Sequence, residues 1–196
     1  MIESEVAEAI GAREDLRPNV AVLVGGSAVI ALVSGLFLPW PVAIASTVLG
    51  ALMLAGADVD ARTYLLPDTV TWGAAGVGIV AAPLLAATDS WLAVSDAAVR
   101  ALCAAVVLEL LRRSYARVRR REGLGFGDVK LGAAVGAWLP LDAIPLCFGL
   151  AASAALVAVM TAHLRGQSIE GATKLPFGAF LCPSLWLVFF ASALPK

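Results

Sequence analysis

Long apolar runs, interrupted by short polar segments, restrict this sequence to very few folds. A helix that crosses a bilayer needs about 20 consecutive and mainly apolar residues, and six runs approach that length: 20–38, 41–57, 70–87, 91–111, 143–162 and 177–194. A shorter run at 129–139 predicts a tilted or partly re-entrant segment. Apolar residues make up 60% of the 196 residues and charged residues only 15%, a balance that excludes an ordinary soluble domain and a disordered chain.

These runs predict an all-α, polytopic transmembrane helix bundle with about seven membrane segments. The ten-residue alternation of a membrane β-barrel is not found in the sequence, and helices are the other way to satisfy backbone groups in lipid. We divide the chain into a cytoplasmic N-terminal segment (1–19), an extra transmembrane helix (20–38) and a six-helix membrane domain (41–194). The N-terminal segment is acidic and lacks the basic start of a signal peptide, so we expect the first span to be retained.

The distribution of basic residues predicts the orientation of the bundle. Residues 112–121 contain six arginines and no acid, and such segments stay on the cytoplasmic side of a membrane. We therefore prefer an orientation signal to a nucleic-acid contact for this segment. The loops expected on the other side contain no lysine or arginine, and an aromatic belt is expected there from Trp40, Trp91 and Trp138.

Two polar segments on the cytoplasmic side, 58–68 and 123–132, concentrate ionisable residues close to the membrane. We interpret both as loops. Between Asp60 and Asp128 the chain crosses the membrane out and back, so both carboxylates return to the same face and are able to meet. The structural alternatives are a solvated Asp60 at a helix end, Asp68 as a helix N-cap, and Asp128 as the cap of the next helix.

A pair of carboxylates that shares one proton is the machinery of aspartic proteolysis. One ionised partner activates a water molecule, and the other, whose pKa is raised by its neighbour, donates a proton. Such a mechanism needs no metal and no cofactor. Gly125 and Gly127 would let a substrate backbone approach closely or, alternatively, form a flexible joint. His163 and the three cysteines are expected to have interfacial and packing roles.

At these segments the sequence resembles the type IV prepilin leader peptidase family, which are membrane aspartic proteases with a GxGD motif. Asp60 is followed eight residues later by Asp68, after Leu66-Pro67, as in the family's first motif. The stretch 125–131 reads Gly-Phe-Gly-Asp-Val-Lys-Leu and matches GxGDxKL. The stretch 175–181 is similar to the family's Pro-Phe-Gly-Pro-Phe-Leu, with Ala179 in place of the second proline.

The resemblance implies that Asp60 and Asp128 are the catalytic pair, and that Gly125, Gly127 and Lys130 bind substrate or support the site. The expected reaction is cleavage of a prepilin or pseudopilin leader after a glycine, at the cytoplasmic face of the bacterial inner membrane. No CxxC pair is present, so the short, peptidase-only form is expected, without methyltransferase activity. Short members often serve Flp-type pili. The lipid bilayer is the other expected partner, and the sequence does not indicate an oligomeric state.

Three other interpretations stay open. A protease similar to presenilin would carry its aspartates within helices deeper in the bilayer, with Tyr-Asp at the first site, whereas here Val59-Asp60 precedes a polar loop. A small transporter or ion-binding membrane protein would use Asp60 and Asp128 to bind a cation or proton, and would show internal repeats. A non-catalytic assembly scaffold would need only the helices.

Overall fold

The computed structural model describes residues 18–86, 90–120, 123–165 and 175–195, and within these ranges all regular structure is helical. The prediction of an all-α bundle is confirmed. The acidic N-terminal segment lies outside the described residues up to position 17. The described helices are α2 (Val20–Phe37), α3 (Trp40–Thr63), α4 (Asp68–Leu85), α5 (Ser90–Arg119), α6 (Phe126–Trp138), α7 (Ile144–Leu164) and α8 (Gly178–Ala193).

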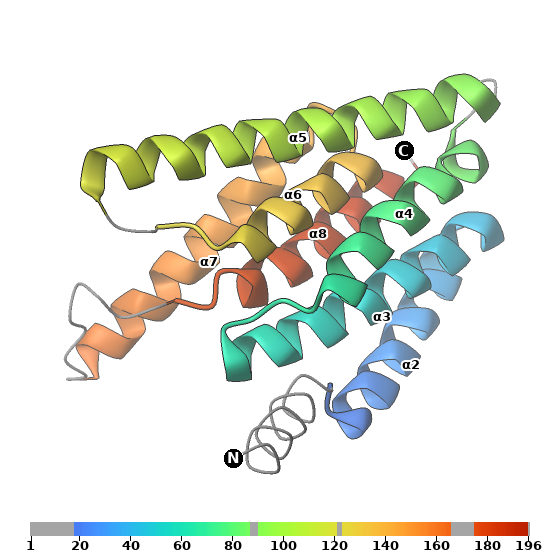
Figure 1. The fold of residues 1–196 in the computed structure, drawn as a ribbon. Helices are drawn as coiled ribbons and strands as arrows, with labels where there is room; N and C mark the ends of the chain where they lie inside the picture. Colours follow the sequence, from blue (N-terminus) through green and yellow to red (C-terminus); the bar gives the residue numbers. More distant parts are fainter. Residues whose placement is uncertain (1–17, 87–89, 121–122, 166–174, 196) are drawn as a thin grey trace, which may run out of the picture.

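Successive helices run in opposite directions (Figure 1). The first turns of α2, α4, α6 and α8 therefore lie at the same end of the bundle as the last turns of α3, α5 and α7. We call this the aspartate end, because it carries Asp60 and Asp128. Contacts between helix ends support the arrangement: Asn19, before α2, donates its N–H to Asp58 on α3 over 2.7 Å.

Five of the helices, α2, α3, α4, α5 and α7, are long and apolar enough to cross a membrane. The other two described helices, α6 and α8, are shorter. α8 has 16 residues and α6 only 13, so that α6 is roughly 20 Å long, less than the roughly 30 Å of a bilayer's hydrocarbon core. The short fifth segment of the sequence is thus a short helix inside the bundle.

α6 packs against α4, α5 and α8 and forms the centre of the molecule. Every residue of α6 from Leu131 to Trp138 is buried. The helix is rich in glycine and alanine, which allow close approach between helices in membranes. A Cβ on Gly136 would clash with the backbone oxygen of Arg100, so α5 and α6 are in backbone contact at this point.

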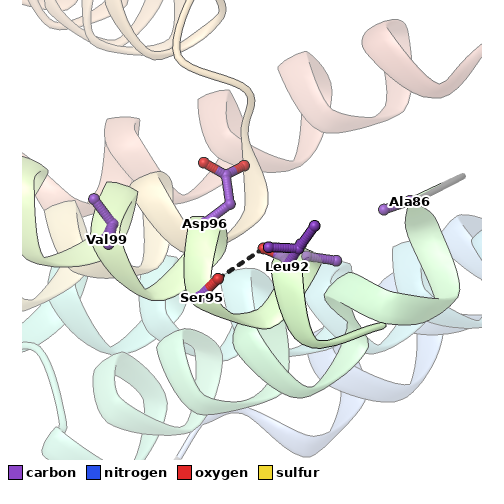
Figure 2. A pocket seen from close by; sticks show the side chains of 6 residues that line it. Ala86, Leu92, Ser95, Asp96 and Val99 are labelled. Carbon is purple, nitrogen blue, oxygen red and sulfur yellow. Dashed lines mark hydrogen bonds between the residues drawn. The ribbon is translucent and has the colours of Figure 1, made fainter. Parts of the chain in front are cut away.

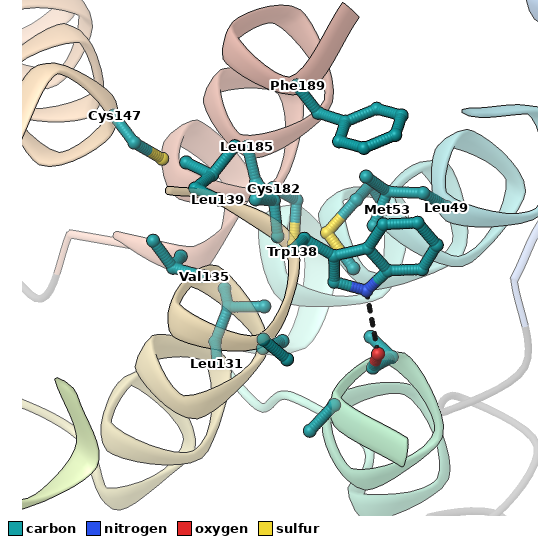
Figure 3. Close-up of a cluster of buried hydrophobic side chains, with 14 of the residues drawn as sticks. Leu49, Met53, Leu131, Val135, Trp138, Leu139, Cys147, Cys182, Leu185 and Phe189 are labelled. Carbon is teal, nitrogen blue, oxygen red and sulfur yellow. Dashed lines mark hydrogen bonds between the residues drawn. The ribbon is translucent and has the colours of Figure 1, made fainter. Parts of the chain in front are cut away.

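Trp138 is buried in this core and is not exposed at the surface of the bundle. Only 4% of its surface is exposed, whereas Trp40 and Trp91 are 77% and 78% exposed. Its indole N–H donates to the backbone oxygen of Ala74 over 2.8 Å, and its ring packs edge-on against Phe189 (Figure 3). The prediction that Trp138 belongs to an aromatic belt is wrong, because the indole finds its hydrogen-bond partner inside the bundle.

Two helices extend further than their apolar runs. α3 continues to Thr63, so Asp58 and Asp60 are helical and the prediction of a loop from residue 58 is wrong. Arg62 supports this last turn by pairing with Asp58 at 2.8 Å, one turn away. The helix ends at Tyr64, which adopts a left-handed conformation with φ of 57°. α5 likewise continues through four arginines to Arg119.

The extra helix α2 packs against α3 and exposes most of its apolar surface. A buried hydrogen bond joins the hydroxyls of Ser34 and Ser46, 2.9 Å apart, and the indole N–H of Trp186 donates to Ser46 over 3.1 Å. These polar contacts connect α2, α3 and α8, so α2 is attached to the same helices that form the candidate site.

Candidate active site

Asp60 lies in the last turn of α3 and is almost completely buried, with 4% of its surface exposed. Its Oδ2 accepts a hydrogen bond from the N–H of Ala179, 2.8 Å away in the first turn of α8. One turn away along each helix, a Cβ on Gly56 would lie 3.0 Å from Cys182 Sγ. The missing side chain at Gly56 lets α3 and α8 approach closely enough for the Asp60 hydrogen bond to form.

Asp128 lies in the first turn of α6, outside the five membrane-spanning helices, and is half-buried. Burial, and then the negative charge of Asp60, raise the pKa of Asp128 from the ordinary 3.8 to about 6. The influence of one charge on another decreases with distance. The two carboxylates, from helices that are far apart in the sequence, therefore interact at the aspartate end of the bundle.

Neither Asp68 nor Asp128 is the N-cap of its helix, which was the structural alternative for each. Gly125 is the N-cap of α6 and Pro67 the N-cap of α4, and neither helix has a side-chain cap hydrogen bond. The N-cap interpretation of Asp68 is therefore wrong. Asp60 is helical, but it lies in the last turn of α3, just before the loop that leads to α4.

The two glycines of the GxGD stretch lie beside the carboxylates. A Cβ on Gly125 would lie 3.3 Å from Asp128 Oδ2, so this position borders the carboxylate directly. A Cβ on Gly127 would lie 3.0 Å from the Cβ of Leu66, a residue of the loop between α3 and α4. The space next to Gly127 is thus occupied by Leu66 in this structure.

Lys130 points away from Asp128. Two residues along a helix differ by about 200° in direction, and Lys130 Nζ pairs with Asp68 Oδ1 at 2.6 Å and lies 4.8 Å from the centre of the Phe126 ring. Lys130 and Phe126 help to line a hollow of about 400 Å³ between α4, α5 and α6, together with Glu109 and Arg113. In this position Lys130 joins the first turns of α4 and α6.

A second hollow, of about 470 Å³, lies between the end of α4 and the start of α5 (Figure 2). Its lining includes Asp96, which pairs with Arg100, and Ser95, whose hydroxyl donates to the Leu92 backbone oxygen over 3.0 Å. The hollow contains neither Asp60 nor Asp128. This hollow is therefore separate from the carboxylate pair.

Sequence reasoning did not identify the contribution of Ala179 and Leu66. Ala179 acts through its backbone N–H, which carries no residue-specific signal, and Leu66 through the position of its side chain. The only sign in the sequence was that both lie in stretches similar to family motifs. The three cysteines differ in exposure. Cys147 and Cys182 are buried, as expected for packing, whereas Cys103 is exposed.

These features define a class of protein: a multi-pass helical membrane protein in which two interacting carboxylates, from separate helices, lie at one end of the bundle. The model of the type IV leader peptidase family matches residues 47–160. The chain belongs to this family, as its motifs indicated.

Several curated proteins are similar over about three quarters of the chain. A prepilin leader peptidase/N-methyltransferase of Pectobacterium carotovorum subsp. carotovorum is 33% identical over 147 residues, covering 74% of this chain and 50% of that protein. A type 4 prepilin-like proteins leader peptide-processing enzyme of Escherichia coli O78:H11 is 34% identical over 148 residues, covering 74% and 51%. The chain therefore spans about half the length of these relatives. No solved structure shows a significant match.

Proposed function

We propose that this protein is a membrane-embedded aspartic endopeptidase that removes the leader peptide of type IV prepilins or pseudopilins, Flp-type pilins included. The observation that carries the proposal is that Asp60 and Asp128, from separate helices, lie together at the aspartate end, where burial and then the charge of Asp60 raise the pKa of Asp128. Membership of the leader peptidase family supports the substrate class. The relatives' names include a methyltransferase activity, which the proposal does not extend to this chain, because its sequence contains no CxxC pair.

In the proposed mechanism the two aspartates hold one proton between them. Asp60, fixed by the Ala179 N–H, removes a proton from a water molecule that attacks the scissile carbonyl carbon. Asp128, with a pKa of about 6, donates its proton to the carbonyl oxygen. Collapse of the tetrahedral intermediate then breaks the C–N bond, and the amine leaves with a proton returned through the pair.

The side of the membrane on which cleavage takes place follows from the position of the aspartate end. We place the aspartate end at the cytoplasmic face of the inner membrane, because the arginines at the end of α5 are at this end. A prepilin with a basic leader and an apolar helix would then present the junction between them at the level of Asp60 and Asp128. Cleavage after a glycine at this junction completes the proposal.

The test is cleavage of a prepilin by the full chain in proteoliposomes. Asp60→Asn and Asp128→Asn each remove a proton-transfer group with little change in size, and each is expected to abolish cleavage while the protein still inserts and accumulates. Asp58→Asn is the matched control, on the same helix and two residues from Asp60. Asp58 bonds to Asn19 and Arg62, so its loss should affect stability and leave the cleavage chemistry intact. Cleavage by either of the first two variants would remove that residue from the mechanism.

A further inference from the structure

The side chain of Leu66 fills the space where three glycines meet. These glycines come from different helices: Gly56 from α3, Gly127 from α6 and Gly178 from α8. A Cβ on Gly178 would lie 2.6 Å from Leu66 Cδ1, a Cβ on Gly127 would lie 3.0 Å from Leu66 Cβ, and a Cβ on Gly56 would lie 3.6 Å from Leu66 Cδ2. One leucine therefore contacts all three helices that surround the carboxylates.

This contact is next to the reacting groups. The Cβ position of Gly178 is 2.9 Å from Asp60 Oδ2 and 2.6 Å from Leu66 Cδ1, so the carboxylate and the leucine methyl group border the same small volume. On the other side, Leu66 packs on Gly127, the residue before Asp128. Leu66 thus forms part of the wall around both aspartates.

The loop that carries Leu66 is set by local structure. The last residue of α3 is Thr63, and the next residue, Tyr64, is the left-handed C-cap. The N–H of Tyr64 donates to the Asp60 backbone oxygen over 2.9 Å. Pro67 then starts α4 with an extended conformation. The chain between them crosses the aspartate end and directs Leu66 inward, while its neighbour Leu65 is 61% exposed.

A scissile peptide bond must come within hydrogen-bond reach of both carboxylates. A substrate residue beside that bond would then meet the methyl groups of Leu66, because Leu66 borders Asp60 at Gly178 and packs on Gly127 next to Asp128. We infer that Leu66 limits the size of the substrate residue next to the scissile bond and thereby selects glycine at that position. This inference rests on the proposed peptidase function. A single methyl group in a confined pocket changes specificity by about 10–200-fold, enough to separate glycine from alanine.

The experiment compares two prepilins that are identical except for glycine or alanine before the cleaved bond. Wild type, Leu66→Ala, Leu66→Val and the matched control Leu65→Ala are reconstituted as full chains in proteoliposomes, and kcat/KM is measured for both substrates. The ratio of alanine to glycine cleavage is expected to rise at least about tenfold in Leu66→Ala, less in Leu66→Val, and to stay at the wild-type value in Leu65→Ala. A loss of folding alone would lower both rates and leave the ratio unchanged.

The outcomes separate this inference from the proposed function. If wild type cleaves the glycine substrate and the ratio in Leu66→Ala stays within about twofold of wild type, the inference is wrong and the peptidase function stands. Loss of both activities in both Leu66 variants would show a purely structural role and also overturn the inference. If wild type cleaves neither substrate, the proposed function itself fails.

Discussion

Replacing Asp128 by asparagine should make the protein inactive and, at neutral pH, more stable. The pKa of Asp128 is raised to about 6, first by burial and then by the charge of Asp60. In the unfolded chain the ordinary value of 3.8 applies. A raised carboxyl pKa means that ionisation costs more in the folded state than in the unfolded state, so stability decreases as the pH rises toward 6.

The size of the effect follows from the two pKa values. Their difference corresponds to about 3 kcal/mol at pH values above 6, as an upper limit, and to nothing below about pH 3.8, where both states are protonated. For a chain of this size, 1 kcal/mol changes Tm by about 2–4 °C. Asp128→Asn is therefore expected to raise Tm at pH 7.5 by at most about 6–12 °C, with a smaller gain at pH 5.

The assay is thermal unfolding in detergent, followed by tryptophan fluorescence at a series of pH values. Asp142→Asn is the matched control, because Asp142 is an exposed aspartate in the turn before α7, at the other end of the bundle. It should unfold like the wild type at every pH. The reasoning that ionised Asp128 destabilises the folded state would be refuted by either of two results. The Asp128→Asn variant could be less stable than wild type at pH 7.5, or its Tm difference from wild type could be the same at every pH.

Three further predictions concern the pH dependence of cleavage, the contact between α5 and α6, and the ion pair between α4 and α6. The kcat/KM for prepilin cleavage should decrease as the pH rises through about 6, because the protonated form of Asp128 is lost; a rate that is constant from pH 5 to 8 would contradict this. Gly136→Ala should destabilise the fold by about 1–3 kcal/mol in thermal or denaturant unfolding, because its Cβ would clash with the backbone of Arg100 on α5. Gly149→Ala is the control, since its Cβ would enter open space and should leave stability unchanged. A double-mutant cycle with Lys130→Gln and Asp68→Asn should give a coupling below about 1 kcal/mol, since the Asp68 side chain is 68% exposed; a larger value would show a stronger link between α4 and α6.

The sequence allowed the helices and the candidate pair to be predicted because both depend on simple counts. A run of about 20 apolar residues predicts a span by its length alone. Asp60 and Asp128 were expected at one face because two crossings separate them. The ends of α3 and α5 were missed, because charged residues with helical partners one turn away continue a helix beyond its apolar part.

Contacts between distant helices could not be predicted in this way. Trp138 looked like an interfacial residue because a single sequence does not show that Ala74 supplies a partner for its indole. The resemblance implied a substrate-binding or supporting role for Lys130, but helix geometry turns its side chain toward Asp68. The Ala179 contact joins residues that are 119 positions apart, and it uses a backbone group that every residue except proline has.

Two of these contacts also explain how Asp128 reaches the level of Asp60. α4 and α6 run in the same direction, and they are joined near the aspartate end by Lys130 and Asp68 and further along by Trp138 and Ala74. A slip of α6 by one turn would break both contacts and move Asp128 by about 5.4 Å, further than a hydrogen bond to a shared water allows. Because α4 begins directly after the loop that follows α3, fixing α6 against α4 also fixes Asp128 relative to Asp60. The geometry of the carboxylate pair is therefore set by the register of α6 against α4, which lies outside the polar stretches that carry the two aspartates.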